Sequence, residues 1–425
     1  MDRIAPLVLQ IYRFAVLAGV GALLQAHFAE MREQGERPVT VSEVRAFLPQ
    51  AHRLVVSSEP GGGLEVRDAA GSRAGHAWRT MPQSRGISGY SGPLDALVVA
   101  GGDGRIVGVA VRHSYDTPSH VEDVGADLYF MEGWNGKSPE EAVAMALELE
   151  QGGVHIVSGA TRTSECLVRS VAERLRPPGA PDSQPIWSPT WRDGVLGGLL
   201  IGALLATFGR GRWLGPWRRV FPWLAFAGLG LLTGDLLAQS LYLGWLRGGV
   251  PWHQTPGVAL LAAAAFLVPG TTKKPVYCSW LCPHGHLQRW LVRWMPARWR
   301  VALPASLRWA LGWFPVMILA VLLVAAFLGL PLDPAGVEPF DAYVWRSAGV
   351  ATLVVAGAGL LVSAFVPMAY CHFGCPTGWL LGLIRRRETG GQSRWDGRDT
   401  AALLLLLLAL GLDAGRPGIQ AWLGL

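Results

Sequence analysis

The chain has 425 residues, of which 51% are hydrophobic and only 16% are charged, and its mean hydropathy is +0.29. This composition is too apolar for an ordinary soluble protein, and five cysteines in so long a chain do not make a disulfide scaffold. A net charge of +6 by itself suggests a nucleic-acid partner. The basic residues lie beside apolar segments, however, as membrane topology requires, so no nucleic-acid partner is predicted.

The apolar residues are unevenly distributed and divide the chain into four parts. An apolar run at Ile4–Phe28, interrupted by Arg13, predicts a membrane anchor, with a signal peptide as the alternative. The predicted fold is an extracytoplasmic α+β domain fused to an all-α polytopic membrane bundle. The parts are an anchor or signal at 1–30, the α+β domain at 31–176, a proline-rich linker at 177–192, and a membrane domain of about six helices at 193–425.

Turn signals and helix caps predict the elements of the α+β domain. Two glycine-rich turns, Gly61–Gly63 and Gly101–Gly104, separate apolar runs and indicate β-hairpins. The sequence Ser138–Glu141 has the spacing of a capping box with proline in the first turn, so a helix is expected from there to about Glu150. The expected strands are 54–58 with 64–67, and 94–100 with 105–111.

A hydroxyl-rich stretch, Val154–Ser164, is the most informative part of this domain. A short apolar strand enters a tight turn at Gly159 and is followed by a helical pattern at Glu165–Leu175. Hydroxyls and free N–H groups at a helix start can bind a phosphate, but they are also ordinary capping groups. Taken alone, the residues favour capping. For Cys166, on the following helix, buried packing is expected rather than chemistry.

Six apolar runs in the second half approach the length of a membrane span. The loops between them alternate in charge, with sixteen Lys or Arg in three loops and only Arg247 and Arg346 in the other two. This bias places the basic loops in the cytoplasm and the α+β domain outside. Asp235, inside the second run, is either a site for protons or a quinone or a local hydrogen-bonding group. The runs are Val195–Phe208, Val220–Trp245, Gly257–Pro269, Ala310–Leu330, Gly349–Met368 and Thr400–Leu412.

Two near-identical phrases, Tyr277–Pro283 and Tyr370–Pro376, contain four of the five cysteines and form an internal repeat. Cysteines four apart share one face of a helical turn, and each phrase ends in a proline that we expect to stop the helix. Four thiolates suit an iron–sulfur centre; structural zinc and a thiol–disulfide relay are the alternatives. The four cysteines are Cys278, Cys282, Cys371 and Cys375. The neighbouring His284, His286 and His372 are either surface residues or substitute ligands.

The phrase Ser158-Gly159-Ala160-Thr161-Arg162-Thr163 resembles the signature of FMN-binding domains in Rnf and Nqr flavin subunits and NosR-type proteins. Upstream, Gly104–Val109, His113 and Asp116-Thr117-Pro118 resemble a strand and turn of that domain. The resemblance implies covalent FMN, held through its phosphate by Thr161 or, as second choice, Thr163. A flavin transferase would attach it outside the cytoplasm. The sequence departs from the pattern at His155, where many such domains have an acidic residue.

The two phrases together with the flavin signature resemble the NosR/NirI family, including its PceC-like members. This resemblance implies an electron-transfer component of the cell inner membrane rather than a stand-alone catalyst. A quinol or cytoplasmic donor would supply electrons through an iron–sulfur cluster to FMN, in a respiratory pathway with redox partner proteins. Because about 30 Å of hydrocarbon would separate the two centres, a further carrier is expected. A flavin-based sensor or a maturation factor is the alternative function. The ferredoxin-like module of longer family members does not occur in this sequence.

Overall fold

The computed structural model describes residues 3–4, 6–34, 38–59, 61–89, 92–116, 118–177, 189–330, 332–344, 348–386 and 393–423. Its internal contacts divide the chain into two compact units. The helical unit comprises Met1–Glu30, Pro189–Ser240 and Thr255–Leu425, and the sheet unit comprises Met31–Ser188 and Leu241–Gln254. Residues 178–188 of the expected linker lie outside the described residues.

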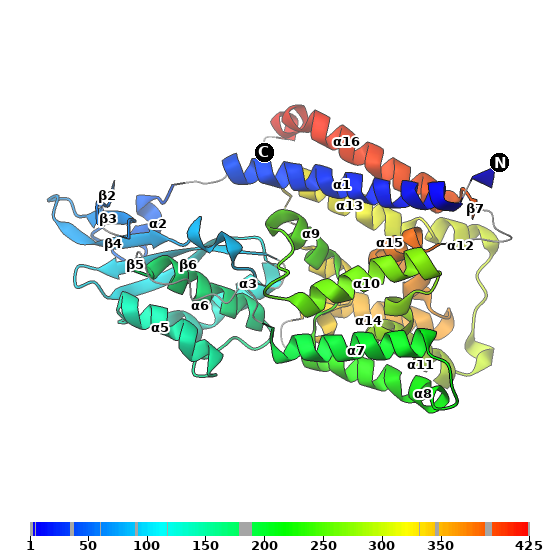
Figure 1. Ribbon diagram of the computed structural model, residues 1–425. Helices are drawn as coiled ribbons and strands as arrows, with labels where there is room; N and C mark the ends of the chain where they lie inside the picture. The colour runs from blue at the N-terminus through cyan, green and yellow to red at the C-terminus, as the bar shows by residue number, and fades with distance from the viewer. Residues whose placement is uncertain are drawn as a thin grey trace. The chain divides into compact units, whose positions relative to one another are not determined.

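The sheet unit is built on one antiparallel sheet in which each strand pairs with the next along the chain (Figure 1). Both expected hairpins are present: β2 pairs with β3 across the first glycine turn, and β5 pairs with β6 across the second. Val98 of β5 lies opposite Val109 of β6. The strands are β2 Arg53–Val56, β3 Leu64–Arg67, β4 Arg73–Arg79, β5 Leu94–Gly101 and β6 Ile106–Ser114.

Strand β5, which lies between β4 and β6, is buried on both faces, and its alternating side chains enter two separate cores. One core, with Leu94 and Val98, packs against the helices on one side of the sheet, including α6. The other, with Leu97 and Val99, packs against the short helix α2. The period of two along the strand therefore explains how one segment supports two layers. The helices are α2 Val41–Arg45, α3 Pro118–Ala126, α4 Leu128–Glu132, α5 Pro139–Glu150 and α6 Thr161–Leu175.

The start of α5 is confirmed as a capping box, because Ser138 accepts from the Glu141 amide and Glu141 accepts from the Ser138 amide. The start of α6 differs from the expectation. This helix begins at Thr161 rather than Glu165, so the hydroxyl-rich phrase itself forms the first turn. Burial of Thr163 and Ser164 within the core explains the difference, because tertiary packing overrides their weak helix propensity.

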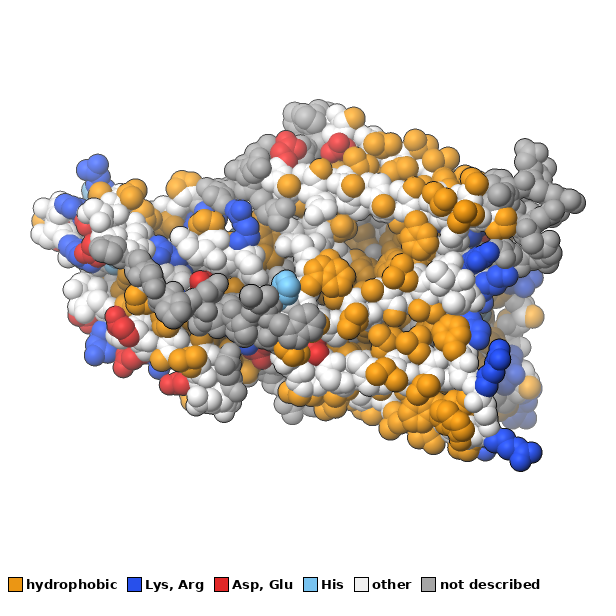
Figure 2. All heavy atoms as spheres, viewed as in Figure 1, with side chains coloured by type: hydrophobic (Ala, Val, Ile, Leu, Met, Phe, Trp, Pro, Cys, Tyr) orange, Lys and Arg blue, Asp and Glu red, His pale blue; other side chains and the backbone are white. Residues whose placement is uncertain are grey.

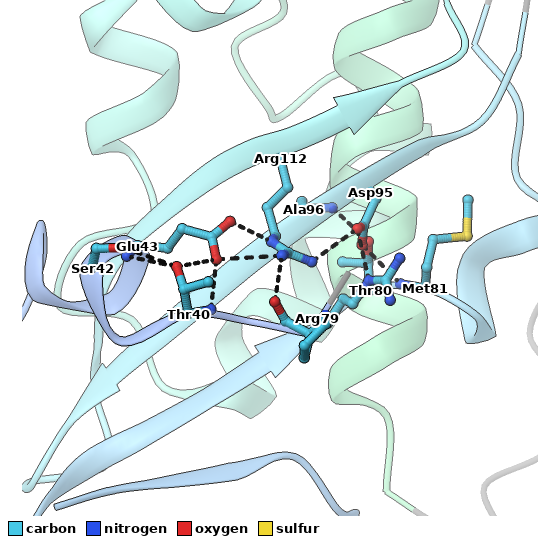
Figure 3. A network of polar contacts seen from close by, with 10 residues as sticks. Thr40, Ser42, Glu43, Arg79, Thr80, Met81, Asp95, Ala96 and Arg112 are labelled. Atoms are coloured by element: carbon cyan, nitrogen blue, oxygen red, sulfur yellow. Dashed lines mark hydrogen bonds and ion pairs between the residues drawn. The ribbon is translucent and has the colours of Figure 1, made fainter. Parts of the chain in front are cut away.

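A polar network ties α2 to the sheet, with Arg112 of β6 at its centre (Figure 3). The Arg112 guanidinium donates to Glu43 at 2.8 Å and to Asp95 at 3.3 Å. Arg79 donates to the same Asp95 carboxylate at 2.7 Å, and Thr40 caps α2 through Glu43. Because Asp95 is buried and accepts from two arginines, the network holds α2, β4, β5 and β6 in register.

Among the described residues, the helical unit has three helices long and apolar enough to cross a membrane: Pro6–Glu30, Trp191–Phe208 and Ala305–Leu328. Two shorter apolar helices, Pro256–Thr272 and Val350–Phe365, accompany them. In Figure 2 hydrophobic side chains cover the visible flank of these helices, and Lys and Arg gather at one end of the unit. The helices are α1 Pro6–Gln34, α7 Trp191–Phe208, α8 Leu214–Ala225, α10 Pro256–Thr272, α11 Pro283–Trp294, α12 Ala305–Leu311, α13 Phe314–Leu328, α14 Val350–Phe365, α15 Pro376–Ile384 and α16 Gly397–Leu423.

Arg13, which interrupts the first apolar run, is buried and has a definite partner. Its guanidinium contacts both carboxylate oxygens of Asp399 on α16, at 2.6 and 2.9 Å. Tyr12 donates to the Asp399 carbonyl oxygen at 2.8 Å. Both charged side chains are almost completely buried. The first and last helices of the unit, which lie side by side in Figure 1, are therefore joined by a paired internal charge.

The expected single span Val220–Trp245 is wrong, because the structure breaks it. Helix α8 passes into a π-helical segment η2, Phe226–Thr233, which ends at Gly234 with φ +68°, and α9 Gln239–Gly248 begins beyond a non-helical stretch. Side chains from other segments take the freed backbone groups: the Leu237 amide donates to the Tyr277 hydroxyl at 3.1 Å. Asp235 is buried in this break and does not lie within a helix.

Candidate flavin and iron–sulfur sites

The hydroxyl-rich phrase of the sheet unit turns sharply into α6. Gly159 has φ +95°, a conformation that glycine adopts without strain. Ala160 is the N-cap residue and offers no side-chain cap, and Thr161 is the first residue of the helix. The helix N-terminus thus has an unused capping position, where its dipole favours a negatively charged group such as a phosphate.

The two candidate threonines lie in different environments. Thr163 is 1% exposed, and its hydroxyl donates to the Asp116 carboxylate at 2.7 Å. Thr161 is half-buried, and its hydroxyl makes no hydrogen bond within the described part of the chain. Only the Thr161 hydroxyl is therefore both accessible and available for bond formation. Thr163 holds Asp116, which fixes the turn before α3 against the first turn of α6.

Tight packing surrounds the Asp116 carboxylate. A Cβ atom built on Gly89 would come within 2.0 Å of an Asp116 side-chain oxygen, and one on Gly92 would come within 2.7 Å of the Tyr115 carbonyl oxygen. Ser164 donates to the Ala160 carbonyl at 2.9 Å and accepts from the Val157 amide at 3.3 Å. Thr117, the other expected flavin contact, lies outside the described residues, so its role stays a prediction.

His155, the residue that departs from the family pattern, lies beside an acidic side chain. Its Nε2 atom is 3.3 Å from a carboxylate oxygen of Asp127, the N-cap residue of α4. The backbone amide of Phe130 and the contact with His155 lower the pKa of Asp127, so this carboxylate is ionised at neutral pH. A negative charge therefore lies next to the position where the resemblance leads us to expect an acidic residue. The sequence pattern alone did not show this pairing, because the two residues are distant in the chain.

The two cysteine phrases adopt the same local structure. In each, the first cysteine lies in a π-helical turn, Tyr277–Leu281 or Tyr370–Gly374, and the second cysteine is the N-cap of the following α-helix. Each π-helical turn ends just before its Cys-Pro pair, as expected, and the prolines also begin the next helices, α11 and α15. Proline suits the first helical position, where no amide hydrogen is needed.

Backbone amides point at the second sulfur of each phrase. The Gly285 amide donates to Cys282 Sγ at 3.5 Å, and the Gly378 amide donates to Cys375 Sγ at 3.0 Å. A Cβ atom built on Gly378 would lie only 3.2 Å from Cys375 Sγ. Gly378 thus allows the close approach in the second repeat, and such N–H···S bonds tune iron–sulfur centres.

Two residues of α11 that the sequence analysis did not single out connect the phrases. Gln288, which is fully buried, donates to Cys371 Sγ at 3.1 Å and accepts from the Cys371 amide at 3.4 Å. Arg289 donates to the carbonyl oxygens of Cys278 and Ser279 at 3.1 and 2.8 Å. One helix, α11, therefore contacts both repeats through consecutive residues. The spacing of these residues, six and seven beyond Cys282, was visible in the sequence, but their burial was not.

The four thiols lie near enough to affect one another. Burial raises the pKa of Cys278, and the neighbouring Cys282 and Cys371 raise it further. Burial and then Cys282 raise the pKa of Cys371 to about 12. Such thiols stay protonated at neutral pH until a metal replaces the protons. The donor set of four soft sulfurs with amide hydrogen bonds therefore fits an iron–sulfur cluster.

The zinc and thiol–disulfide alternatives stay predictions at this point. Among the described residues, no three His, Cys, Asp or Glu side chains are grouped closely enough to share a single ion.

Two of the three neighbouring histidines differ from the surface expectation. His284 and His286 are buried, at 1% and 2% exposure, whereas His372 is exposed, as the surface interpretation expects. The His286 ring contacts the Trp280 carbonyl oxygen at 2.9 Å. The surface interpretation was therefore wrong for the first two. Cys166 is buried as expected, and burial raises its pKa to about 12, which agrees with a packing role.

Comparison with known families identifies both regions. The FMN-binding domain family matches residues 89–176, which contain the Thr161 phrase. The 4Fe-4S binding domain family matches residues 254–302 and 348–390, so each segment contains one cysteine phrase. The chain thus combines an FMN-binding domain with a 4Fe-4S binding domain. The narrower NosR/NirI resemblance stays a prediction, because these matches are to the two domains only.

A curated relative comes from Escherichia coli (strain K12), where it is named "Putative electron transport protein YccM". It is 28% identical to this chain over 180 residues, which cover 38% of the chain. The chain spans less than half of the relative's length, at 45%. No solved structure matches the chain.

Proposed function

We propose that this chain is a membrane electron-transfer protein that carries electrons between an iron–sulfur cluster and a covalently bound FMN. The observation that carries the proposal is the presence of both cofactor phrases in one chain, each at a helix start whose geometry suits its cofactor. The name of the curated relative supports electron transport. When bound, the flavin and the cluster would supply the redox chemistry, which belongs to the cofactors.

In the sheet unit, Thr161 would hold the flavin through a phosphate ester. The donor would be flavin adenine dinucleotide bound by the transferase. The bond from phosphorus to the Thr161 oxygen forms, the pyrophosphate bond breaks, and AMP leaves with the proton. The first turn of α6 would stabilise the phosphate with its dipole. Ser158, Gly159 and Ala160 would form the turn around it, while Thr163 keeps Asp116 in place.

In the helical unit, Cys278, Cys282, Cys371 and Cys375 would each bind one iron. Gln288 would position the second phrase, and the Arg289 guanidinium would offset the negative charge of the cluster. A membrane position is supported by the three candidate spans, and the loop charges support a cytoplasmic side for the cysteines and an outer side for the flavin. The inner membrane, quinol as a donor, and the redox partners of a respiratory system complete the proposal.

The test is flavin fluorescence of the denatured full-length chain after expression with a flavin transferase. We expect a fluorescent band in the wild type that disappears in Thr161→Ala and remains in Thr161→Ser, because serine keeps the hydroxyl. Thr163→Ala is the matched control: it loses the bond to Asp116 but should keep the flavin. Attachment lost in Thr163→Ala and kept in Thr161→Ala would contradict the assignment.

A further inference from the structure

The loop between α13 and α14 enters the helical unit and reaches the cysteine region. It contains two short 3-10 turns, Pro334–Val337 and Asp341–Tyr343. Loop charges predict that this loop and the cysteine phrases lie on opposite sides of a membrane. Glu338, between the two turns, is nevertheless 1% exposed. The loop therefore does not end at a surface but returns into the interior of the unit.

Two loop side chains contact equivalent positions of the two repeats. The Tyr343 hydroxyl is 2.9 Å from Nδ1 of His284, which lies two residues after Cys282. The Glu338 carboxylate accepts from the Thr377 hydroxyl at 2.7 Å and from the Thr377 amide at 3.3 Å. Thr377 lies two residues after Cys375. One loop thus binds the same place in both cysteine repeats, although the repeats are far apart in sequence.

Burial of the Glu338 carboxylate at this position costs folding free energy. A third donor, the Gln239 amide, lies 2.6 Å from the carboxylate, and the Gln239 side chain donates to the Thr377 hydroxyl at 2.9 Å. Within the described residues, no Lys or Arg forms an ion pair with Glu338. Burying a carboxylate without a cation costs several kcal/mol by general estimates. An apolar side chain at position 338 could fill the same space at a lower cost in folding free energy. Stability alone therefore does not explain why a glutamate occupies this position.

We propose that Glu338 and Tyr343 form a clamp that positions the two cysteine phrases around one cluster and makes that cluster harder to reduce. This inference rests on the proposed function. Glu338 is a positioning residue that acts through Thr377, and Tyr343 acts through His284. A negative charge close to the cluster disfavours an added electron, because Coulomb repulsion is strong in a buried site. The positive Arg289 guanidinium has the opposite effect, because it favours reduction of the cluster.

The test is a redox titration of the cluster in the purified full-length chain, followed by electron paramagnetic resonance at alkaline pH, where carboxylates are ionised. Dithionite supplies the electron, and no bond to the protein forms or breaks. The variants are Glu338→Gln and Tyr343→Phe. Asp333→Asn is the matched control, because it removes one charge from the same loop at a residue that caps the first 3-10 turn instead.

We expect Glu338→Gln to raise the midpoint potential with iron content unchanged. At the wild-type midpoint, the ratio of reduced to oxidised cluster should rise roughly tenfold, the effect of removing one nearby charge at low dielectric. Tyr343→Phe should alter the spectrum of the reduced cluster, and Asp333→Asn should change neither property. If Glu338→Gln cannot hold the cluster, Tyr343→Phe decides by the same spectral measurement.

Unchanged potential and spectrum in both clamp variants would overturn the proposal, as would an equal potential shift in Asp333→Asn. A wild-type chain that binds no iron–sulfur cluster would instead overturn the proposed function. The two failures are therefore distinguishable in one set of samples.

Discussion

The flavin phrase and the cysteine phrases both begin a helix, but they use its N-terminus in opposite ways. In α6 the N-cap residue, Ala160, supplies no side-chain cap, and the next hydroxyl, on Thr161, has no hydrogen bond among the described residues. In α11 and α15 the N-cap residue is itself a ligand candidate, and its sulfur already accepts an amide hydrogen bond. The first arrangement leaves a group open for a covalent bond. The second holds buried sulfurs ready for metal.

The largest effect that would sharpen this comparison is loss of the cluster. Replacing Cys282 or Cys371 by serine removes a soft thiolate ligand, so we expect iron and the cluster spectrum to be lost almost completely. Flavin fluorescence of the sheet unit should remain at the wild-type level, which is the control for expression. Iron content unchanged in both variants would show that these sulfurs are not ligands.

The next largest effect concerns the buried pair of Arg13 and Asp399. Arg13→Ala leaves the Asp399 carboxylate buried without its cation, and such changes cost about 3–5 kcal/mol of unfolding free energy. Thermal aggregation of the full-length chain in detergent measures this loss. The double variant Arg13→Met with Asp399→Leu should recover most of the stability, because no uncompensated charge remains. Equal loss in the single and double variants would contradict this account.

A smaller effect is expected from glycine-to-alanine substitutions, and it should differ between the two cysteine repeats. Gly378→Ala places a methyl group 3.2 Å from Cys375 Sγ, whereas the nearest atom for Gly285→Ala is the Cys278 carbonyl oxygen at 3.4 Å. We therefore expect Gly378→Ala to broaden or shift the cluster signal and to lower iron content about twofold, as a displaced metal ligand does. Gly285→Ala, its matched control, should change less. The reverse order would show that the repeats are not positioned as described.

The smallest effect lies in the polar network of the sheet unit. Burial raises the pKa of Glu43, but hydrogen bonds from Arg112 and Thr40 outweigh it and bring the pKa from 4.5 down to about 2. The stabilisation is therefore fully present above pH 4.5 and is lost as the pH falls toward 2. Because the Glu43 side chain is 34% exposed, solvent screening limits its contribution to about 1 kcal/mol.

Hydrogen exchange of α2 in the full-length chain across this pH range measures the contribution of Glu43. In Glu43→Gln the protection should be lower near neutral pH and should depend less on acid. The comparison uses about pH 5 and about pH 3, which lie on either side of the usual carboxylate pKa of about 4. Wild-type protection that is the same at both pH values would mean that the network does not hold α2.

The hairpins, the α5 cap and the repeat were predictable because each depends on residues close together in the sequence. Glycine turns fix the strands around them, and the spacing of Ser138 and Glu141 fixes a capping box. The break after Thr233 was not predictable in this way. The Leu237 amide is satisfied by the Tyr277 hydroxyl from a distant segment, and apolar periodicity alone does not report such a partner.

The chemical residues divide in the same manner. Thr161 and the four cysteines were predicted from local phrases, because their spacing carries the signal. Gln288 and Glu338 were not, since their contacts with Cys371 and Thr377 form only in the folded chain. A buried polar residue in an apolar region is the general signal that could have found them.

The most direct test of the central claim is the cofactor content of the purified full-length chain, expressed with a flavin transferase under anaerobic conditions. The account predicts one covalent FMN and about four irons with four sulfides per chain, the composition of a single four-iron cluster. Zinc in place of iron, or iron without flavin in the presence of a working transferase, would contradict it.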